Sequence, residues 1–253
     1  MNYITEIYED MISKIPAPNH ESKIWSKSHN KLSVCLIEFR CHKYIEKVLH
    51  NMSNIYGGTD VMLYIIHGNT NAKYIQDIIH EWENVKLIQL EIDNINIETY
   101  NQLLTTSTLY DLFETEFVLI FQTDTLIRKQ IPPIFFNYSY VGAPWKGYPN
   151  DFPDNPQIKL GNKRVGNGGF SLRHVKRMKS LLSAHQRKPH SKLKEDVYIS
   201  NHLSDEEIPP VEIAKGFSVE WVYDEDPVGL HAVWTKFPLE IVNKWLKEIV
   251  IID

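Results

Sequence analysis

Four short apolar runs, separated by segments with helical spacing, constrain the fold of this chain most strongly. The runs, which we expect to be buried strands, cover residues 32–39, 61–68, 85–92 and 117–122. Between them, apolar residues recur with the period of an amphipathic helix in segments 42–55, 72–82 and 97–113. Strands that alternate with helices predict an α/β fold with βαβ units, a mostly parallel central sheet and right-handed crossovers.

The pattern changes after residue 130. We expect a short strand at 140–145, a strand followed by a helix from 165, a helix from 194, β-like chain over 216–234 and a terminal helix at 239–248. Residues 146–163 are rich in Pro, Gly and Asn, which predicts a long loop that serves as a lid or as a wall of a binding site. These features favour an N-terminal peripheral segment, 1–30, and one domain, 31–253, with halves 31–130 and 131–253.

The composition excludes several functional classes. A formal net charge of −5 argues against a broad nucleic-acid-binding face. No segment has the length of a transmembrane helix, and the acidic start of the chain does not resemble a signal peptide. The only two cysteines, Cys35 and Cys41, are too few for a disulfide framework, so we expect free thiols and a cytoplasmic location.

One strand ends in a polar group that suggests a site. The apolar run from Phe117 turns polar at Gln122, Thr123 and Asp124. In open α/β sheets ligands bind beyond the carboxyl ends of the strands, so Asp124 is a candidate ligand for something held at that edge. The alternative is a strand-end aspartate that closes a turn.

Four stretches in order, FQTDT, VGNGGFSLR, KEDVYIS and GLHAVW, together resemble glycosyltransferases of the GT-A fold. The third is similar to the Glu-Asp-Val motif of the β-1,3-galactosyltransferases. With YVGAPW, the set also resembles a family of largely uncharacterised glycosyltransferase-like domains from bacteria and large viruses. The resemblance covers roughly residues 32–235, and it implies a GT-A-like (Rossmann-like) sheet flanked by helices.

The resemblance implies a divalent cation, Mn²⁺ or Mg²⁺, held by Asp124 and by His231. The family pattern is Asp-x-Asp, and this chain has Gln122 at the first position, which leaves metal affinity to one carboxylate and the donor phosphates. For His231 the alternative is an ordinary core or surface histidine.

Asp196 and Glu195 are the catalytic candidates. The resemblance assigns Asp196 as the general base of an inverting transfer, while Glu195 would bind acceptor hydroxyls or orient Asp196. Both acids precede an apolar helical stretch, where carboxylates also serve simply to stabilise a helix N-terminus.

The remaining candidates fall into two groups. The nucleotide-binding candidates are Glu38, Phe39, Arg40, Tyr100, Asn101, Gln122 and Thr123. The candidates for contact with the sugars are Trp145, Asn167, Gly168 and Gly169. The glycines allow close approach of a ligand to the backbone, and Trp145 offers an apolar ring; a tight turn and a half-buried core aromatic are the structural alternatives.

The sequence therefore predicts a metal-dependent hexosyltransferase that uses a nucleotide-diphosphate sugar, with UDP favoured, and a glycan or other hydroxyl acceptor. A nucleotidyltransferase is a weaker hypothesis, because no glycine-rich basic signature lies near the first strand. A third hypothesis is a non-catalytic glycan- or nucleotide-binding protein with a degenerate transferase fold. Gln122 in place of the first motif aspartate supports that third hypothesis.

Overall fold

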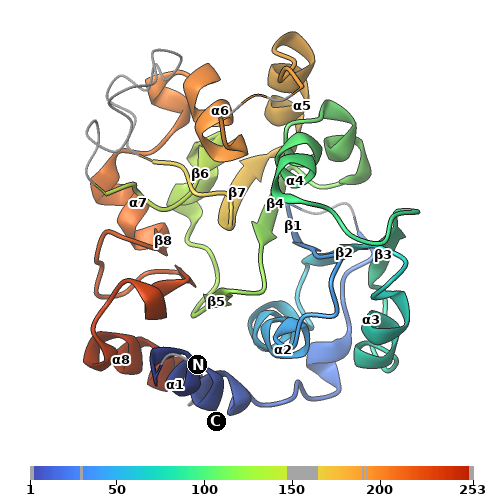
Figure 1. Ribbon diagram of the computed structural model, residues 1–253, viewed down its shortest axis with the longest axis vertical. Helices are drawn as coiled ribbons and strands as arrows, with labels where there is room; N and C mark the ends of the chain where they lie inside the picture. Colours follow the sequence, from blue (N-terminus) through green and yellow to red (C-terminus); the bar gives the residue numbers. More distant parts are fainter. Residues whose placement is uncertain (1–2, 29–30, 147–164, 190, 192, 251–253) are drawn as a thin grey trace.

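A computed structural model describes residues 3–28, 31–146, 165–189, 191 and 193–250. Its main sheet has six strands in the order β3-β2-β1-β4-β7-β6 (Figure 1). These strands are β1 (Leu32–Ile37), β2 (Met62–His67), β3 (Lys86–Gln89), β4 (Phe117–Phe121), β6 (Tyr140–Val141) and β7 (Phe170–His174). Strands β1 to β4 are parallel to one another, whereas β7 runs antiparallel to both β4 and β6. The predicted α/β class, the mostly parallel sheet and the single domain are confirmed.

A second, three-stranded sheet lies beside the first, in the order β5-β9-β8. Its strands are β5 (Thr125–Ile127), β8 (Ser218–Val219) and β9 (Gly229–His231). The segment 216–234, expected to be β-like, is β-strand only at β8 and β9; its first two residues end a helix and its last two begin a 3₁₀ turn. The pairing of β5 with β9 brings residue 231 opposite residue 125, directly after the end of the central strand β4.

Helices cover both faces of the main sheet. The helices are α1 (Tyr3–Ser13), α2 (Ile45–Tyr56), α3 (Ala72–Ile78), α4 (Ile97–Leu104), α5 (Val175–Ala184), α6 (Glu195–His202), α7 (Val211–Phe217) and α8 (Leu239–Val250). Short 3₁₀ turns are η1 (Glu21–Lys23), η2 (Ser107–Leu112), η3 (Pro133–Asn137), η4 (Asp205–Glu207) and η5 (Val233–Thr235).

Side chains that alternate along the strands divide the interior into two apolar clusters. One contains Val34 and Leu36 of β1 and packs against α1, α2, α3, α8 and the small sheet. The other contains Cys35 and Ile37 and packs against α4, η2, α5 and α6. Figure 1 shows the same division, with α4, α5 and α6 on one side and α1, α2 and α8 on the other. The strands are buried on both faces, as expected for parallel strands between helical layers.

The N-terminal segment contributes to this interior. Tyr8, Ile12 and Trp25 are buried in the first cluster, and the ring of Tyr8 stacks on Trp234 with 3.5 Å between ring centroids. The described part of this segment, residues 3–28, therefore shares the core of the domain, although α1 lies at the edge of the molecule in Figure 1.

Two expected elements are shorter than their sequence patterns suggested. The helix expected over 97–113 ends at Leu104 and is followed by η2, because the hydroxyl groups of Thr105 and Thr106 donate back to helix carbonyls and close the last turn. The strand expected over 140–145 is regular only at Tyr140 and Val141. The loop expected over 146–163 lies, from residue 147 onward, outside the described residues.

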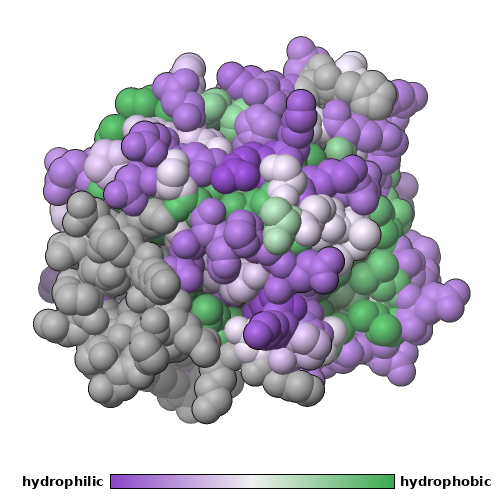
Figure 2. Space-filling view, turned by 90° about the horizontal axis from the view of Figure 1, so that it is seen from above, coloured by the Kyte–Doolittle hydropathy of each residue, from purple (hydrophilic) through white to green (hydrophobic). Residues whose placement is uncertain are grey.

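The face in Figure 2 is largely hydrophilic, and its hydrophobic residues form separate patches rather than a continuous band. No helix in the described parts of the chain is both long and apolar enough to cross a membrane. Cys35 is buried, Cys41 is exposed, and both are free thiols.

Candidate active site

The topology places three chain segments at one edge of the main sheet. The parallel strands β1 and β4 end there, and they are followed by Glu38 and Gln122 respectively. Strand β7 runs the other way, and the register pairs Phe121 at the end of β4 with Phe170 at the start of β7. The turn before β7, with Asn167, is therefore beside the carboxyl ends of β1 and β4, which is the usual position of ligands in α/β folds.

A first cavity of about 400 Å³ opens at the ends of β1 and β4. It includes six of the seven predicted nucleotide-binding residues, all except Asn101, together with Asp124. Its lining residues are Ile37, Glu38, Phe39, Arg40, His42, Tyr44, Asn94, Ile95, Asn96, Ile97, Tyr100, Gln122, Thr123 and Asp124. The strand-end pattern thus located this cavity, but it missed His42, Tyr44 and the segment 94–97.

Glu38 is held firmly in the wall of the first cavity. Its carboxylate accepts hydrogen bonds from the backbone N–H groups of Phe39 and Arg40, both at 2.9 Å, and from two guanidinium nitrogens of Arg40 at 2.8 and 2.7 Å. Burial favours the neutral acid, but these donors outweigh it and lower the pKa of Glu38. Glu38 therefore remains ionised and fixes the loop after β1.

A second cavity of about 490 Å³ adjoins the first. It gathers the remaining candidates of both groups and the two catalytic candidates. Its lining residues are Ile97, Tyr100, Asn101, Gln122, Trp145, Lys146, Asn167, Gly168, Gly169, Lys194, Glu195, Asp196, Val197, Glu220, Trp221 and His231. The lining residues that were not predicted are Ile97, Lys146, Lys194, Val197, Glu220 and Trp221. The position of the last two has a simple explanation. They follow the two-residue strand β8, which is too short to give a recognisable pattern.

The two cavities share Ile97, Tyr100 and Gln122. The side-chain amide of Gln122 donates to the Tyr100 hydroxyl at 2.9 Å. This bond gives Gln122 a role in the wall between the cavities, at the position where the Asp-x-Asp pattern has its first carboxylate.

Asp124 and His231 meet where the cavities adjoin. Asp124 Oδ1 lies 3.4 Å from His231 Nε2. The pairing of β5 with β9 produces this contact, and the N–H of Ala232 donates to the Asp124 carbonyl at 2.9 Å. Ala232 has a left-handed backbone with φ of 48°, which is costly for a residue with a Cβ and is found mainly at functional or tightly constrained sites. The fold thus joins two candidates that are far apart in the sequence.

The two groups influence each other's protonation. Burial disfavours the charged form of each, but the hydrogen bond and opposite charge of the partner outweigh it. As a result the pKa of His231 is raised and the pKa of Asp124 is lowered. The ionised Asp124 carboxylate therefore favours a positive charge next to it.

The turn that carries Asn167, Gly168 and Gly169 fits against the protein's own side chains. A Cβ on Gly168 would lie 1.5 Å from Glu195 Oε1, and one on Gly169 would lie 2.3 Å from His231 Nε2. Asn167 has φ of 85°, and its side-chain oxygen accepts the Gly169 N–H at 2.8 Å. The glycines are needed because two candidate site residues occupy the space of their missing side chains.

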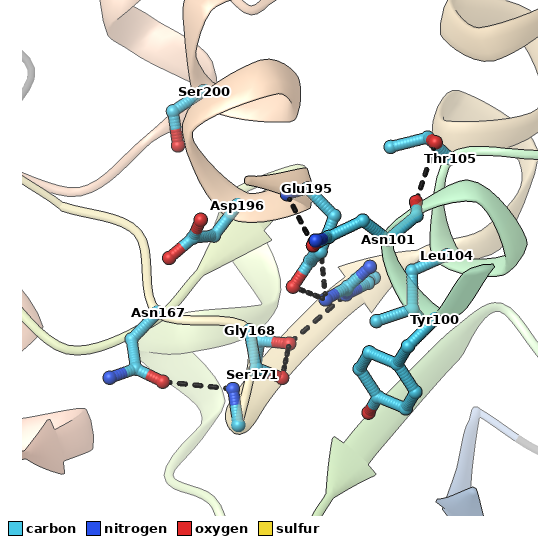
Figure 3. Close-up of polar contacts among 12 residues, drawn as sticks. Tyr100, Asn101, Leu104, Thr105, Asn167, Gly168, Ser171, Glu195, Asp196 and Ser200 are labelled. Atoms are coloured by element: carbon cyan, nitrogen blue, oxygen red, sulfur yellow. Dashed lines mark hydrogen bonds and ion pairs between the residues drawn. The ribbon is translucent and has the colours of Figure 1, made fainter. Parts of the chain in front are cut away.

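Glu195 belongs to a buried polar network rather than to the open part of the cavity. Both of its oxygens accept from Arg173 on β7, at 3.1 and 3.0 Å, and its backbone N–H donates to Asn101 Oδ1 at 3.0 Å (Figure 3). Arg173 also donates to Tyr110 and Ser171. Burial raises the pKa of Glu195 to about 7, and the charge of Arg173 opposes this rise. Glu195 therefore anchors the start of α6 to the sheet.

Asp196 is the next residue of the same helix, and its carboxylate points away from that of Glu195 (Figure 3). It is half-buried, lines the second cavity and accepts a hydrogen bond from the Val197 N–H at 2.8 Å. Burial raises the pKa of Asp196, with Val197 and Lys194 opposing the rise. Asp196 is thus the carboxylate of this pair that is placed to take a proton.

Asp124 and His231 suit a hard divalent cation. Two ligands of one octahedral ion, each about 2.1 Å from it, lie roughly 3 Å apart, close to the separation found here. His231 Nδ1 is buried and lacks a hydrogen-bond partner among the described residues, with Glu220 Oε1 at 3.7 Å. Within the same residues no group of three or more His, Cys, Asp or Glu side chains is arranged to hold an ion. The described part of the chain therefore offers two candidate ligands, and the rest of the coordination sphere would come from water and phosphate.

A protein-family comparison matches residues 84–231, more than half of the chain, to the family described as a protein of unknown function (DUF5672). The chain belongs to this family. The matched range includes the wall between the cavities, the glycine turn, both catalytic candidates and both candidate metal ligands, whereas the loop after β1 lies outside it. No curated protein matches the chain.

The chain is similar to solved structures of glycosyltransferases at low sequence identity. An active-site mutant of LgtC aligns over 79% of this chain and 86% of its own, with 12% identity and a TM-score of 0.53. The galactosyltransferase LgtC in complex with donor and acceptor sugar analogs aligns over 67% and 69%, with 13% identity and a TM-score of 0.48. *S. aureus* TarS aligns over 68% and 55%, with 17% identity and a TM-score of 0.48. The mutant LgtC alignment shows that this DUF5672 chain has a GT-A-like fold.

Proposed function

We propose that the chain is an inverting glycosyltransferase that moves a hexose from a nucleotide-diphosphate sugar, with UDP favoured, to a hydroxyl group of a glycan or other acceptor. One observation carries the proposal. Two cavities adjoin at the Asp124–His231 pair, and Asp196 faces the second of them. A donor that spans both cavities would place its diphosphate at the pair and its sugar near Asp196.

The first cavity suits the nucleoside. It combines aromatic rings from Phe39, Tyr44 and Tyr100 with polar groups at the ends of β1 and β4. Arg40, a predicted nucleotide-binding residue, is paired with Glu38, and its side chain is 58% exposed and remains accessible from the cavity.

The second cavity suits the sugars and the proton transfer. In the proposed step, Asp196 accepts the proton of the acceptor hydroxyl as that oxygen bonds to the anomeric carbon. The bond from the same carbon to the diphosphate oxygen breaks, and the nucleoside diphosphate leaves with the electron pair. Attack opposite the leaving group inverts the anomeric centre, and a positioned base of this kind contributes on the order of 10²–10⁴-fold in rate.

Asp124 and His231 would hold Mn²⁺ or Mg²⁺. When bound, such an ion neutralises the charge that develops on the departing diphosphate. The residues of the chain then orient the donor: the pair marks the diphosphate position, and the Gln122–Tyr100 bond separates the nucleoside side from the sugar side.

A donor screen tests the proposal. The chain is incubated with UDP-, GDP-, ADP- and dTDP-sugars, with Mn²⁺ or with chelator, and release of nucleoside diphosphate is measured. We expect release from at least one donor, accelerated by an acceptor and abolished by chelator. Failure of every donor both to bind and to react would contradict the proposal.

A second candidate function, a binding protein without transferase activity, is favoured by Gln122. Its amide is bonded to Tyr100 and replaces a carboxylate of the Asp-x-Asp pattern. Thermal shifts with UDP and GDP discriminate the two functions. Stabilisation that needs Mn²⁺ favours the transferase, and stabilisation that is independent of Mn²⁺ favours the binding protein.

A further inference from the structure

The two ring nitrogens of His231 have different surroundings. Nε2 faces Asp124 at 3.4 Å, at the junction of the cavities. Nδ1 is buried, has no hydrogen-bond partner among the described residues, and lies 3.7 Å from Glu220 Oε1. That distance is too long for a hydrogen bond, but a small movement of either side chain would close it.

We propose that Glu220 is a positioning residue that accepts a hydrogen bond from the N–H at His231 Nδ1 and so presents the lone pair of Nε2 to a cation beside Asp124. The inference rests on the proposed function. A neutral imidazole carries one proton, so Nε2 can bind a cation only when the proton is on Nδ1. Histidines that bind metals usually donate this second N–H to a carboxylate or carbonyl, which fixes both the tautomer and the ring orientation.

Glu220 is held for this task by the turn before β7. The side-chain amide of Asn167 donates to Glu220 Oε2, which leaves Oε1 directed at His231. The same Asn167 accepts the N–H of Gly169, whose missing side chain makes room for the His231 ring. One turn therefore fixes both the imidazole and the carboxylate that faces its buried nitrogen.

This arrangement also distinguishes Glu220 from Asp196. One oxygen of Glu220 is bonded to Asn167 and the other faces the imidazole, and its side chain is only 17% exposed. Asp196 has a backbone hydrogen bond to one oxygen and lines the same cavity. Glu220 thus acts through His231, whereas Asp196 acts on the acceptor.

The substitution Glu220→Gln should change the tautomer of His231 although it preserves the shape of the side chain at 220. Asn167 donates to the residue at 220, so the glutamine oxygen would turn toward Asn167 and its NH₂ group toward His231. An NH₂ group beside Nδ1 forces the imidazole proton onto Nε2 and blocks the cation. Replacing a carboxylate by an amide at the orienting position of a hydrolase triad is damaging for the same reason.

The experiment compares Mn²⁺ binding by calorimetry, in the presence of UDP, for the wild-type chain, Glu220→Gln and Glu220→Ala. We expect Glu220→Gln to bind Mn²⁺ about 10–100-fold more weakly, the usual effect of losing an outer partner of a metal site. Glu220→Ala, in which water can accept the Nδ1 proton, should lose less. A merely structural role predicts the opposite order, because glutamine preserves the shape and alanine does not.

The control is Glu225→Gln, which changes an exposed glutamate five residues later. It should bind Mn²⁺ as the wild-type chain does.

A second readout does not depend on activity or on the ion. Imidazole ¹⁵N shifts in metal-free protein at alkaline pH report the tautomer, with the His231 signal identified by its loss in His231→Gln. Asp124 faces Nε2 in both chains and favours a proton there, so the test is the difference between them: we expect a larger share of the Nδ1–H tautomer in the wild-type chain than in Glu220→Gln.

The outcomes separate the two proposals. If the wild-type chain binds no Mn²⁺, the proposed function fails and the role of Glu220 fails with it. If the wild-type chain binds Mn²⁺ but Glu220→Gln binds it equally well or keeps the same tautomer, only the role of Glu220 is overturned.

Discussion

The two cavities shift the pKa values of their carboxylates in opposite directions. In the first, donors surround Glu38 and His231 faces Asp124, and these partners outweigh burial and lower both pKa values. In the second, burial dominates and raises the pKa values of Asp196 and Glu220. Glu195 follows the second pattern, although Arg173 pairs with it.

This difference matches a division of labour. Carboxylates with lowered pKa values stay ionised and can hold a cation or fix a loop. Carboxylates with raised pKa values accept protons at a pH closer to neutrality, as a general base must. In the proposed function the first cavity holds charge and the second transfers the proton, and the following substitutions test this division in order of expected effect.

Asp196→Asn should remove the proton acceptor of the second cavity and leave the first intact. We expect a loss of transfer on the order of 10²–10⁴-fold with unchanged nucleotide affinity. The amide keeps the shape of the side chain, so its oxygen still accepts from the Val197 N–H and the melting temperature should change little. Initial rates and nucleotide calorimetry give the two readouts.

Glu212→Gln is the matched control, because Glu212 is the second residue of α7 as Asp196 is the second residue of α6. It should leave the rate unchanged. A product with retained anomeric configuration, read by NMR, would remove Asp196 from the role of base even if Asp196→Asn were inactive.

Arg173→Met should show that the second cavity depends on a buried charge pair. The change leaves the Glu195 carboxylate without its partner, which typically costs about 3–5 kcal/mol and lowers the Tm of a chain of this size by on the order of 10 °C. Chemical denaturation and calorimetry measure it. Arg40→Met, in the first cavity, is the counterpart and should cost only about 0–1 kcal/mol, because the Arg40 side chain is 58% exposed.

The double variant with Arg173→Met and Glu195→Met sharpens this test. It removes both charges, so it should recover much of the lost stability. Equal stability of Arg173→Met and the wild-type chain would show that the pair does not support the second cavity.

Asp124→Asn should weaken the Mn²⁺-dependent binding of UDP by at least about tenfold, since the loss of even an outer partner of a metal site costs this much. The fold should survive, because the Asp124 carboxylate is partly exposed and its backbone carbonyl still accepts from Ala232. Calorimetry with and without Mn²⁺ measures the effect. Asp77→Asn on α3 is the control, and an unchanged affinity in Asp124→Asn would remove Asp124 from the site.

Lys194→Met should have the smallest effect of these substitutions, which is a shift of the pH dependence of kcat/KM. Asp196 works as a base only when ionised, and its raised pKa places the acidic fall of kcat/KM above the pH expected for an ordinary aspartate. The charge of Lys194 favours the carboxylate, so its removal should move that fall to still higher pH. The maximal rate should stay close to that of the wild-type chain. A shift to lower pH would contradict this account of the second cavity.

The first cavity could be predicted because its residues follow long buried strands. Apolar runs define where β1 and β4 end, and parallel strands bring Glu38 and Asp124 to one edge. The direction of β7 could not be predicted in this way, because a buried run reads the same in either direction. Yet this antiparallel strand is what places the turn with Asn167 beside the carboxyl end of β4.

The second cavity was less predictable because the residues that hold its walls in place interact in pairs that are far apart in the sequence. Arg173 lies inside a strand, where a charged residue suggests a solvent-facing side chain, and only the folded chain shows that Glu195 and Tyr110 surround it. Glu220 follows a strand of two residues and has no motif of its own. Asp196 and His231 were found by resemblance, and the structure adds what holds each of them.

The pairing of β5 with β9 has a consequence for synthesis of the protein. His231 emerges from the ribosome about a hundred residues after Asp124, roughly 5–20 s later at ordinary elongation rates. During that interval the parallel strands β1 to β4 can already pair, while the edge of β5 still lacks its neighbour. We therefore expect the contact between Asp124 and His231 to be the last part of the proposed site to form on a nascent chain. Binding of the proposed nucleotide should then begin only after β9 has paired with β5.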